Sequence, residues 1–216
     1  MYLLRSLEAR AAAGNPIRVG LIGAGKFGSM YLSQARRTVG MHLLAVADLS
    51  PARAKESLLR TGWSEDRLTA KSFSEAKSKG TTYLLDAADA LIAADEIDVV
   101  IDATGNPALG IHHVLQCCKY GKHMVMVNVE ADALAGPLLA QKARAAGIVY
   151  SLAYGDQPAL ICEQVEWARG AGFDAGADVG CLGPHERNGL ALHVGAHERT
   201  VGVVVLEEGN QGRRDR

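Results

Sequence analysis

Short, nearly continuous apolar runs alternate along the chain with segments in which apolar residues recur at helical spacing. Several of the runs consist almost entirely of Val, Ile, Leu and Met, which is typical of strands buried on both faces of a parallel sheet. Six of the runs predict strands, over Ile17–Ile22, His42–Ala47, Thr82–Leu85, Ile97–Asp102, His123–Asn128 and Ile148–Leu152.

Helical patterns lie between these runs, and their ends carry ordinary helix signals. The predicted helices are Gly28–Arg37, Pro51–Arg60, Ala108–Tyr120 and Ala133–Ala146. Ser50 and Asn106 stand where an N-cap is expected, each before a proline that suits the first helical turn. Strands that alternate with helices predict an α/β fold with a doubly wound parallel sheet and right-handed crossovers. A helical domain with buried segments is the alternative, and the repeated order of strand, stop and helix disfavours it.

The two ends of the chain differ from this α/β pattern. Apolar residues near the N-terminus have helical spacing, which predicts a leading helix within residues 1–15. The α/β domain is expected over residues 16–155. After about Gly170 the chain becomes rich in Gly, His and Arg, and only Val201–Leu206 reads as a strand. We therefore expect an irregular, partly disordered tail over residues 175–216.

Composition narrows the class of protein. The chain has 216 residues, of which 48% are hydrophobic and 22% charged, as expected of a soluble globular protein. The net charge of -1 gives no reason to expect nucleic acid or an anionic membrane as a partner. No apolar run approaches the roughly 20 residues that span a bilayer, and the first residues do not form a secretory signal. The four cysteines show no disulfide framework, so a cytoplasmic location is expected.

Three glycines follow the first predicted strand in the sequence GAGKFG, which matches the pattern G-x-G-x-x-G. Gly23 suits a tight turn, Gly25 lets a pyrophosphate approach the backbone, and Gly28 lets the helix pack close to the sheet. The phosphates would meet free N–H groups and the positive end of the helix dipole. Lys26 and Phe27 lie inside the motif and are included among the predicted contacts. The motif predicts a Rossmann-type dinucleotide-binding domain; a tight turn without a ligand is the alternative.

Asp48 ends the second predicted strand about 20 residues after Gly28, where a carboxylate binds the 2′-hydroxyl of the adenosine ribose. That position favours NAD. Arg53 follows closely, and an arginine there can pair with the 2′-phosphate of NADP. An exposed helix residue is the alternative role for Arg53, so the sequence leaves the choice between NAD and NADP open.

A second wall of the cofactor site is predicted after the fourth strand. Ligands of such folds bind outside the carboxyl ends of the strands. The turn that follows this strand is expected to cover the nicotinamide ribose, and its residues are Ala103, Thr104, Gly105 and Asn106. Asn128, at the end of the fifth strand, is predicted to join them. Capping of the next helix by Asn106 is compatible with this role.

Carboxylates near the ends of the fifth and sixth strands are the candidate catalytic groups. Glu130 and Asp132 follow the fifth strand, and Asp156 follows the sixth. Partial burial would raise the pKa of Glu130 and suit it to acid–base catalysis. Carboxylates at the start of a solvated helix, stabilised by the helix dipole, are the alternative. A divalent metal, if required, would bind these oxygens and Asn128, although the sequence itself shows no metal site.

Histidines and cysteines elsewhere give weaker signals. His112 and His113 are adjacent on a predicted helix and therefore point in different directions, so a structural role is expected. Cys117 and Cys118 on the same helix are expected to be small buried side chains. The tail has the spacing C-x3-H and H-x3-H, which resembles a zinc site, but the glycines around it disfavour the helix that would align the ligands. The tail residues concerned are Cys181, His185, His193 and His197.

Several stretches together resemble the nucleotide-binding domain of homoserine dehydrogenase and related two-domain oxidoreductases. They are NPIRVGLIGAGKFGSMYLSQ, DVVIDATGNPALGIHH, KHMVMVNVEAD and YGDQPALICEQVEWARGAGFD. The resemblance covers about residues 1–174 and is closest to reductases like 1-deoxy-D-xylulose 5-phosphate reductoisomerase. It implies reduction of a small phosphorylated or polyhydroxylated carbonyl compound with a nicotinamide cofactor. In the reductoisomerase-like members the cofactor is NADPH, and reduction is coupled to a rearrangement that feeds isoprenoid precursor synthesis.

The chain departs from this family pattern at Asp174. Family members continue into a substrate-binding and dimerisation portion, which would begin here with residues 156–174. A frameshift or truncation would explain the different tail, and a homo-oligomer is expected where the full portion is present. The sequence thus predicts an NAD(P)-dependent oxidoreductase or its nucleotide-binding part. The alternatives are a catalytically silent dinucleotide-binding or sensor module and a truncated gene product.

Overall fold

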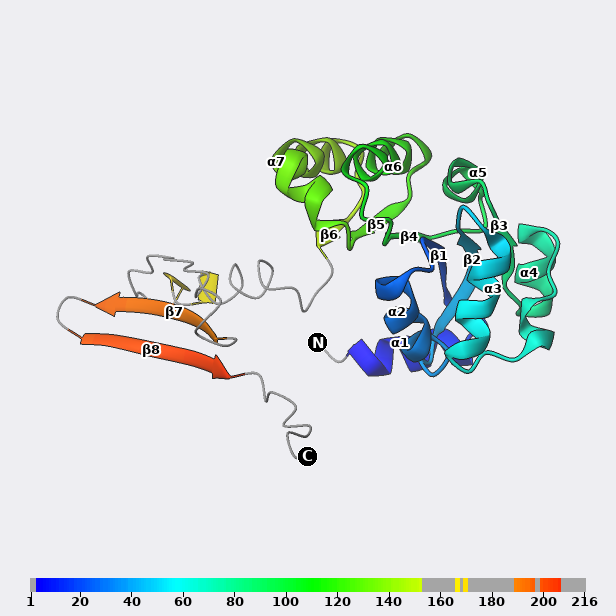
Figure 1. Ribbon diagram of the computed structural model, residues 1–216, viewed down its shortest axis with the longest axis horizontal. Coiled ribbons are helices and arrows are strands. Elements are labelled where there is room, and N and C mark those ends of the chain that lie inside the picture. The colour runs from blue at the N-terminus through cyan, green and yellow to red at the C-terminus, as the bar shows by residue number, and fades with distance from the viewer. Residues whose placement is uncertain (1–2, 153–165, 168, 171–188, 197–198, 207–216) are drawn as a thin grey trace, which may run out of the picture. The chain divides into compact units, whose positions relative to one another are not determined.

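The computed structural model describes residues 3–152, 166–167, 169–170, 189–196 and 199–206 (Figure 1). The chain divides into two compact units, Met1–Ala153 and Tyr154–Arg216. The first unit holds the α/β domain and the second a β-hairpin. No helix in the described part of the chain is long and apolar enough to cross a membrane.

The first unit is built on a six-stranded sheet in the order β3-β2-β1-β4-β5-β6, with every neighbouring pair parallel. The strands are β1 (Ile17–Ile22), β2 (Met41–Ala47), β3 (Tyr83–Leu85), β4 (Val99–Asp102), β5 (His123–Met126) and β6 (Tyr150–Leu152). The strand order reverses between β1 and β4. In such a sheet the crevice outside the carboxyl ends of these two strands is where ligands bind.

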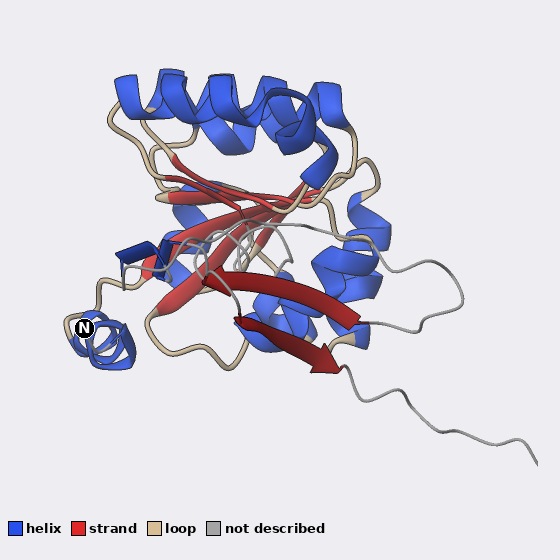
Figure 2. Cartoon of the chain, turned by 90° about the vertical axis from the view of Figure 1, so that its left-hand side faces the viewer, coloured by secondary structure: helices blue, strands red, loops and turns tan. Residues whose placement is uncertain are grey.

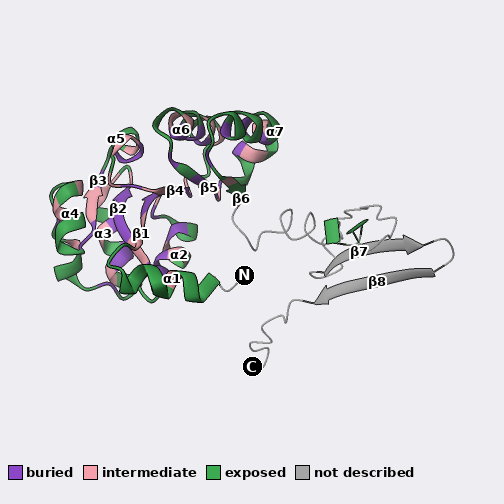
Figure 3. Ribbon diagram, turned by 180° about the vertical axis from the view of Figure 1, so that it is seen from behind, coloured by how far each residue is buried: buried purple, intermediate pink, exposed green. Residues whose placement is uncertain are grey.

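Helices cover both faces of this sheet, as Figure 2 shows. They are α1 (Leu3–Ala12), α2 (Lys26–Ala35), α3 (Pro51–Arg60), α4 (Phe73–Lys79), α5 (Ala88–Ala93), α6 (Pro107–Tyr120) and α7 (Val129–Ala145), with a 3-10 turn at Glu65–Leu68. Two apolar clusters form the core, one including α5, α6 and α7 and the other α2 and α3. Figure 3 shows that burial is concentrated in the strands and on the inner sides of these helices.

The predicted fold class is confirmed, and the observed elements differ mainly at their ends. The bounds of β1 and α3 are as predicted. Helix α7 begins at Val129 rather than Ala133, because Asn128 caps it by accepting a hydrogen bond from the N–H of Ala131. The sequence analysis missed α4 and α5, which are only seven and six residues long.

The second unit contains one strand that was not predicted. Strand β7 (Gly189–Ala196) pairs antiparallel with β8 (Arg199–Leu206), so that Gly189 lies opposite Leu206. The expectation that only Val201–Leu206 is a strand was therefore wrong. The sequence GLALHVGA places larger apolar residues at every second position, and its glycines and histidine obscured this period of two. The rest of the predicted tail, residues 175–188, 197–198 and 207–216, lies outside the described part.

Candidate dinucleotide-binding site

A cavity of about 630 Å³ lies at the carboxyl edge of the sheet, beside the point where the strand order reverses. Its walls come from the ends of β1, β2 and β4, from the connection between β3 and α5, and from α6. The predicted site residues among its lining are Gly23, Gly25, Asp48, Arg53, Ala103, Thr104 and Asn106. The cavity therefore brings together the first two glycines of the motif, the acidic residue and the second predicted wall.

The three glycines of the motif have different surroundings. Gly23 has φ 92°, and a Cβ there would lie 2.8 Å from the carbonyl oxygen of Ala103. A Cβ on Gly28 would collide with the carbonyl oxygen of Gly23. A Cβ on Gly25 would have no atom within 4 Å, so the missing side chain leaves open space on the wall of the cavity. These surroundings fit the tight turn, the close packing and the open approach that the motif predicts.

The N-terminus of α2 opens next to Gly25. Gly25 is its N-cap residue and supplies no side-chain hydrogen bond to the first turn. The first N–H groups of a helix have no partner within the helix, and together with the helix dipole they favour an anion. The side chains of Lys26 and Phe27 are exposed and do not line the cavity. The backbone of this turn, rather than those side chains, fits a pyrophosphate.

Asp48 connects two loops at the cavity wall. Its Oδ2 accepts a hydrogen bond from the N–H of Ala24 at 2.9 Å, and its Oδ1 accepts one from the N–H of Ser50 at 3.0 Å. Ser50 in turn caps α3 by accepting a hydrogen bond from the N–H of Arg53. Arg53 is exposed and lines the same cavity. The predicted carboxylate and the predicted arginine therefore face one space.

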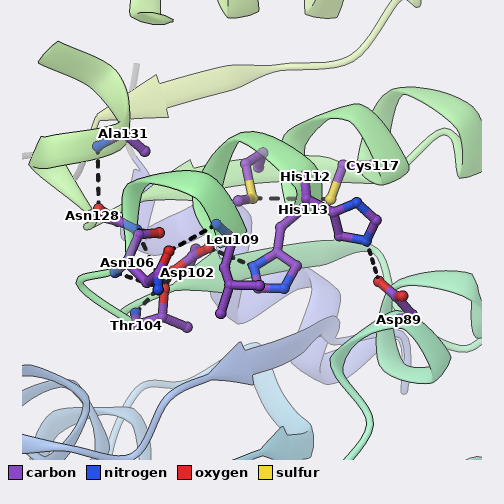
Figure 4. A network of polar contacts seen from close by, with 11 residues as sticks. Asp89, Asp102, Thr104, Asn106, Leu109, His112, His113, Cys117, Asn128 and Ala131 are labelled. Atoms are coloured by element: carbon purple, nitrogen blue, oxygen red, sulfur yellow. Dashed lines mark hydrogen bonds and ion pairs between the residues drawn. The ribbon is translucent and has the colours of Figure 1, made fainter. Parts of the chain in front are cut away.

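A buried carboxylate that the sequence analysis did not single out anchors the loop after β4. Asp102 is fully buried, and its Oδ1 accepts hydrogen bonds from the N–H and the hydroxyl of Thr104 at 2.9 and 2.7 Å (Figure 4). The position of Asp102 at the carboxyl end of a strand was a signal that could have identified it. The bonds hold Thr104 at the cavity wall.

Asn128 supports the same loop from behind. Its Nδ2 donates to the carbonyl oxygen of Asn106 at 2.7 Å and to the hydroxyl of Thr104 at 3.3 Å. Its Oδ1 caps α7, and the residue is buried and does not line the cavity. Asn106 lines the cavity and caps α6 through the N–H of Leu109, whereas Gly105 is exposed and does not line the cavity. Asn128 therefore positions this loop in the structure.

The two adjacent histidines on α6 bind different carboxylates, as their predicted directions require (Figure 4). His112 is exposed and lies 2.8 Å from Oδ1 of Asp89 on α5. His113 is buried, and its Nδ1 lies 2.7 Å from Oδ2 of Asp102. Both histidines line the cavity. The wall formed by α6 is thus held by carboxylates at two points.

Glu130 and Asp132, the candidate catalytic carboxylates within the described residues, do not line this cavity. Glu130 is exposed in the first turn of α7, so the partial burial expected for an acid–base role is not found. Asp132 accepts a hydrogen bond from the hydroxyl of Tyr150 at 2.7 Å. Burial and this bond to Asp132 raise the pKa of Tyr150. Asp156 lies outside the described residues.

Metal-binding groups do not gather in the part of the chain that the structure describes. No group of three or more His, Cys, Asp or Glu side chains that could hold a metal ion occurs among the described residues. Cys181, His185 and His197 of the zinc-like spacing lie outside them. Cys117 is buried on α6, and burial together with the nearby Cys118 and Asp102 raises its pKa to about 12. Cys117 is thus a buried apolar group, as predicted.

The family of the homoserine dehydrogenase NAD-binding domain matches residues 19–152. The chain belongs to this family, whose members are NAD-binding oxidoreductase domains, and the predicted family resemblance is confirmed at this level. No curated protein sequence matches the chain.

The chain is also similar to solved structures. The chain is similar to the yvaA protein of Bacillus subtilis, with 19% sequence identity and a TM-score of 0.50 over 74% of this chain and 42% of that one. An NAD binding oxidoreductase from Klebsiella pneumoniae has 24% identity and a TM-score of 0.49, over 72% and 39% of the two chains. A homoserine dehydrogenase from Thiobacillus denitrificans has 23% identity and a TM-score of 0.48, over 64% and 29%. The chain spans less than half the length of these proteins.

Proposed function

We propose that residues 16–152 bind a nicotinamide dinucleotide across the carboxyl edge of the sheet. The observation that carries the proposal is the open N-terminus of α2: Gly25 supplies no capping side chain and no Cβ where the first turn meets the cavity. The pyrophosphate binds there, against free backbone N–H groups. A volume of about 630 Å³ is in the range of small-molecule sites and suits part of a dinucleotide.

The adenosine ribose binds beside Asp48. This carboxylate is held in place by the hydrogen bonds that it accepts from two backbone N–H groups. Each of its oxygens has a further lone pair that can accept a hydrogen bond from a ribose hydroxyl. In NADPH the 2′-phosphate takes the place of that hydroxyl, and Arg53 is the cationic side chain at the same wall. We therefore propose that both cofactor forms bind, NADH through Asp48 and NADPH through Arg53.

The nicotinamide half extends toward the loop of Thr104 and Asn106. Asp102 and Asn128 hold this loop by hydrogen bonds to Thr104 and Asn106 where it meets the cavity. When bound, the nicotinamide ring supplies or accepts a hydride, while the protein positions the partner and excludes water. Together with the family assignment, this arrangement supports an oxidoreductase.

The substrate that we propose is a small phosphorylated or polyhydroxylated carbonyl compound, with a reductoisomerase-like reaction as one form of the chemistry. This part of the proposal rests on the resemblance of the loops around Thr104 and Asn128. A second candidate function is a catalytically silent dinucleotide-binding module. It is favoured by the exposure of Glu130 and by the engagement of Asp132 with Tyr150, which leave no buried acid or base among the predicted catalytic residues that the structure describes.

The test is a pair of fluorescence titrations of the purified chain with NADH and NADPH, followed by a reduction assay. Saturable binding of either cofactor supports the site. Oxidation of the bound cofactor by sugar phosphates or polyhydroxylated ketones supports the oxidoreductase, whereas binding without turnover favours the silent module. A melting temperature that saturating NADH and NADPH both leave unchanged contradicts the proposal, because a ligand of the folded state must stabilise it.

A further inference from the structure

His113 has an arrangement that packing alone does not require. It lies on α6 at the cavity wall with a side chain that is only 4% exposed, and its partner Asp102 is fully buried. Oδ1 of Asp102 already accepts two hydrogen bonds from Thr104, and Oδ2 faces Nδ1 of His113 at 2.7 Å. The carboxylate thus has a hydrogen-bond partner on each oxygen.

This pairing determines which ring nitrogen of His113 carries the hydrogen. Where Asp102 accepts hydrogen bonds on both oxygens, Nδ1 of His113 is the donor of this pair. The hydrogen bond at one ring nitrogen determines what the other nitrogen can do. In the neutral ring, Nε2 is therefore left with a lone pair that can accept a hydrogen bond.

Nε2 of His113 has access to the cavity. Figure 4 shows one ring nitrogen directed at Asp102 and the other on the opposite side of the ring. No hydrogen-bond partner of Nε2 is found among the described residues. Nε2 is also not one of the buried side-chain atoms without a partner in this part of the chain, which are the hydroxyl of Tyr31 and Oγ1 of Thr81. Nε2 is therefore accessible, and because His113 lines the cavity, we infer that Nε2 faces it.

We propose that Nε2 of His113 accepts a hydrogen bond from the bound dinucleotide, and that Asp102 is the positioning residue that orients the ring for this contact. The ligand groups that can donate are the ribose hydroxyls, the amino group of adenine and the carboxamide of nicotinamide. This inference rests on the proposed function, since it names a further contact in the same site. It gives the buried carboxylate two tasks, because the same side chain also holds the loop of Thr104.

The first experiment follows the imidazole itself. The chain is labelled with 15N, and the Nε2 resonance of His113 is recorded by NMR as NADH is added to saturation. A shift of this resonance, with no shift for His42 at the opposite edge of the sheet, is the expected result. An Nε2 resonance that does not move while NADH saturates overturns the inference and leaves the proposed function standing. Failure of both NADH and NADPH to bind overturns the inference and the proposed function together.

A matched variant measures the strength of the contact. In His113→Asn the amide N–H can take the place of Nδ1 toward Asp102, but no atom replaces Nε2. Loss of one hydrogen bond is expected to weaken NADH binding roughly two- to tenfold. A folded His113→Asn variant with unchanged affinity overturns the inference. If this variant does not fold, the NMR titration of the wild-type chain decides.

The donor on the ligand is identified with an NADH analogue that carries hypoxanthine in place of adenine, so that a carbonyl oxygen replaces the amino group. If the analogue no longer shifts the Nε2 resonance, the contact is with the adenine amino group. If the shift persists, the donor is a ribose hydroxyl or the carboxamide of nicotinamide. Either result supports the contact.

The variant Asp102→Asn tests the positioning role of Asp102. Its amide N–H can face Nδ1 of His113, and the resulting change of tautomer at Nε2 is the spectroscopic sign of that role.

Discussion

The carboxylate of Asp48 holds the glycine-rich loop to the end of β2, because its Oδ2 accepts a hydrogen bond from the backbone N–H of Ala24 at 2.9 Å. Ala24 lies between the first two glycines of the motif. The same carboxylate lines the cavity and is the proposed partner of the adenosine ribose. One side chain therefore couples the shape of the phosphate-binding loop to recognition of the ribose.

Replacing Asp48 with asparagine tests this coupling. An amide nitrogen cannot accept a hydrogen bond, so the N–H of either Ala24 or Ser50 loses its partner. We expect Asp48→Asn to weaken NADH binding by about tenfold or more and to lower the free energy of unfolding by about 1–2 kcal/mol. Fluorescence titration and urea unfolding measure the two effects. Asp66→Asn, at an exposed position, is the control. If Asp48→Asn binds NADH as tightly as this control and has the same free energy of unfolding, the proposed role of Asp48 is contradicted.

Arg53 is expected to distinguish the two cofactor forms. Its guanidinium is exposed at the cavity, and the 2′-phosphate of NADPH is the group that it can pair with. We expect Arg53→Ala to weaken NADPH binding roughly tenfold and to change NADH binding by less than about twofold. Arg60→Ala, at the other end of the same helix, is the matched control in parallel titrations. An equal loss for both cofactors would exclude a specific contact with the 2′-phosphate.

The layered fold and the phosphate-binding loop could be predicted because local sequence signals determine them. The buried strands are short apolar runs. The N-termini of α3 and α6 are marked by the capping residues Ser50 and Asn106, each followed by a proline. The three glycines were assigned roles that their surroundings fit. Short helices were missed, since α5 has too few residues to show a period of 3.6.

The polar network around Asp102 could not be predicted because it depends on packing between elements. Nothing local in the sequence shows that His113 turns toward β4 and His112 toward α5. The same limit applies to Asn128, whose position at the end of a strand was read as a cofactor contact. The structure places it behind the loop, where it binds Asn106. Position along the chain indicates the edge of the sheet, but not which side chain faces the cavity.

Acid is expected to weaken the link between β1 and the segment before β4. Asp98 accepts hydrogen bonds from the backbone N–H of Arg18 at 2.8 Å and from its guanidinium. Burial raises the pKa of Asp98, but the bonds from Arg18 outweigh it and hold the pKa below its ordinary value. A carboxyl whose pKa is lower in the folded state contributes stability above its unfolded pKa, and this stability is lost as the pH falls through the folded value.

We therefore expect Asp98→Asn to lower the free energy of unfolding by about 1 kcal/mol at neutral pH, a modest value because both side chains are partly exposed. The difference from the wild-type chain should shrink from about pH 4 downward and vanish once Asp98 is protonated in the folded state. Urea unfolding at a series of pH values measures it, with Asp66→Asn as the control. A difference that stays constant from neutral to acid pH would show that the charge of Asp98 is not responsible.

Two alanine substitutions in the glycine motif are expected to separate folding from binding. In Gly28→Ala the new Cβ would collide with the carbonyl oxygen of Gly23, a backbone atom that cannot move without shifting the loop. We expect a loss of about 1–3 kcal/mol in the free energy of unfolding, as for other overpacked sites. In Gly25→Ala the Cβ meets no atom within 4 Å, and φ of -68° suits alanine, so stability should change little.

Gly25→Ala is expected to weaken ligand binding, although it should change stability little. The Cβ of Gly25→Ala occupies the open space in front of the first turn of α2, where the pyrophosphate is proposed to bind, so NADH affinity should fall by about tenfold or more while the fold is kept. Thermal melting and fluorescence titration of the two variants measure both quantities. Because Gly25→Ala leaves the loop unstrained, unchanged NADH affinity in this variant would mean that the pyrophosphate does not approach the backbone at Gly25.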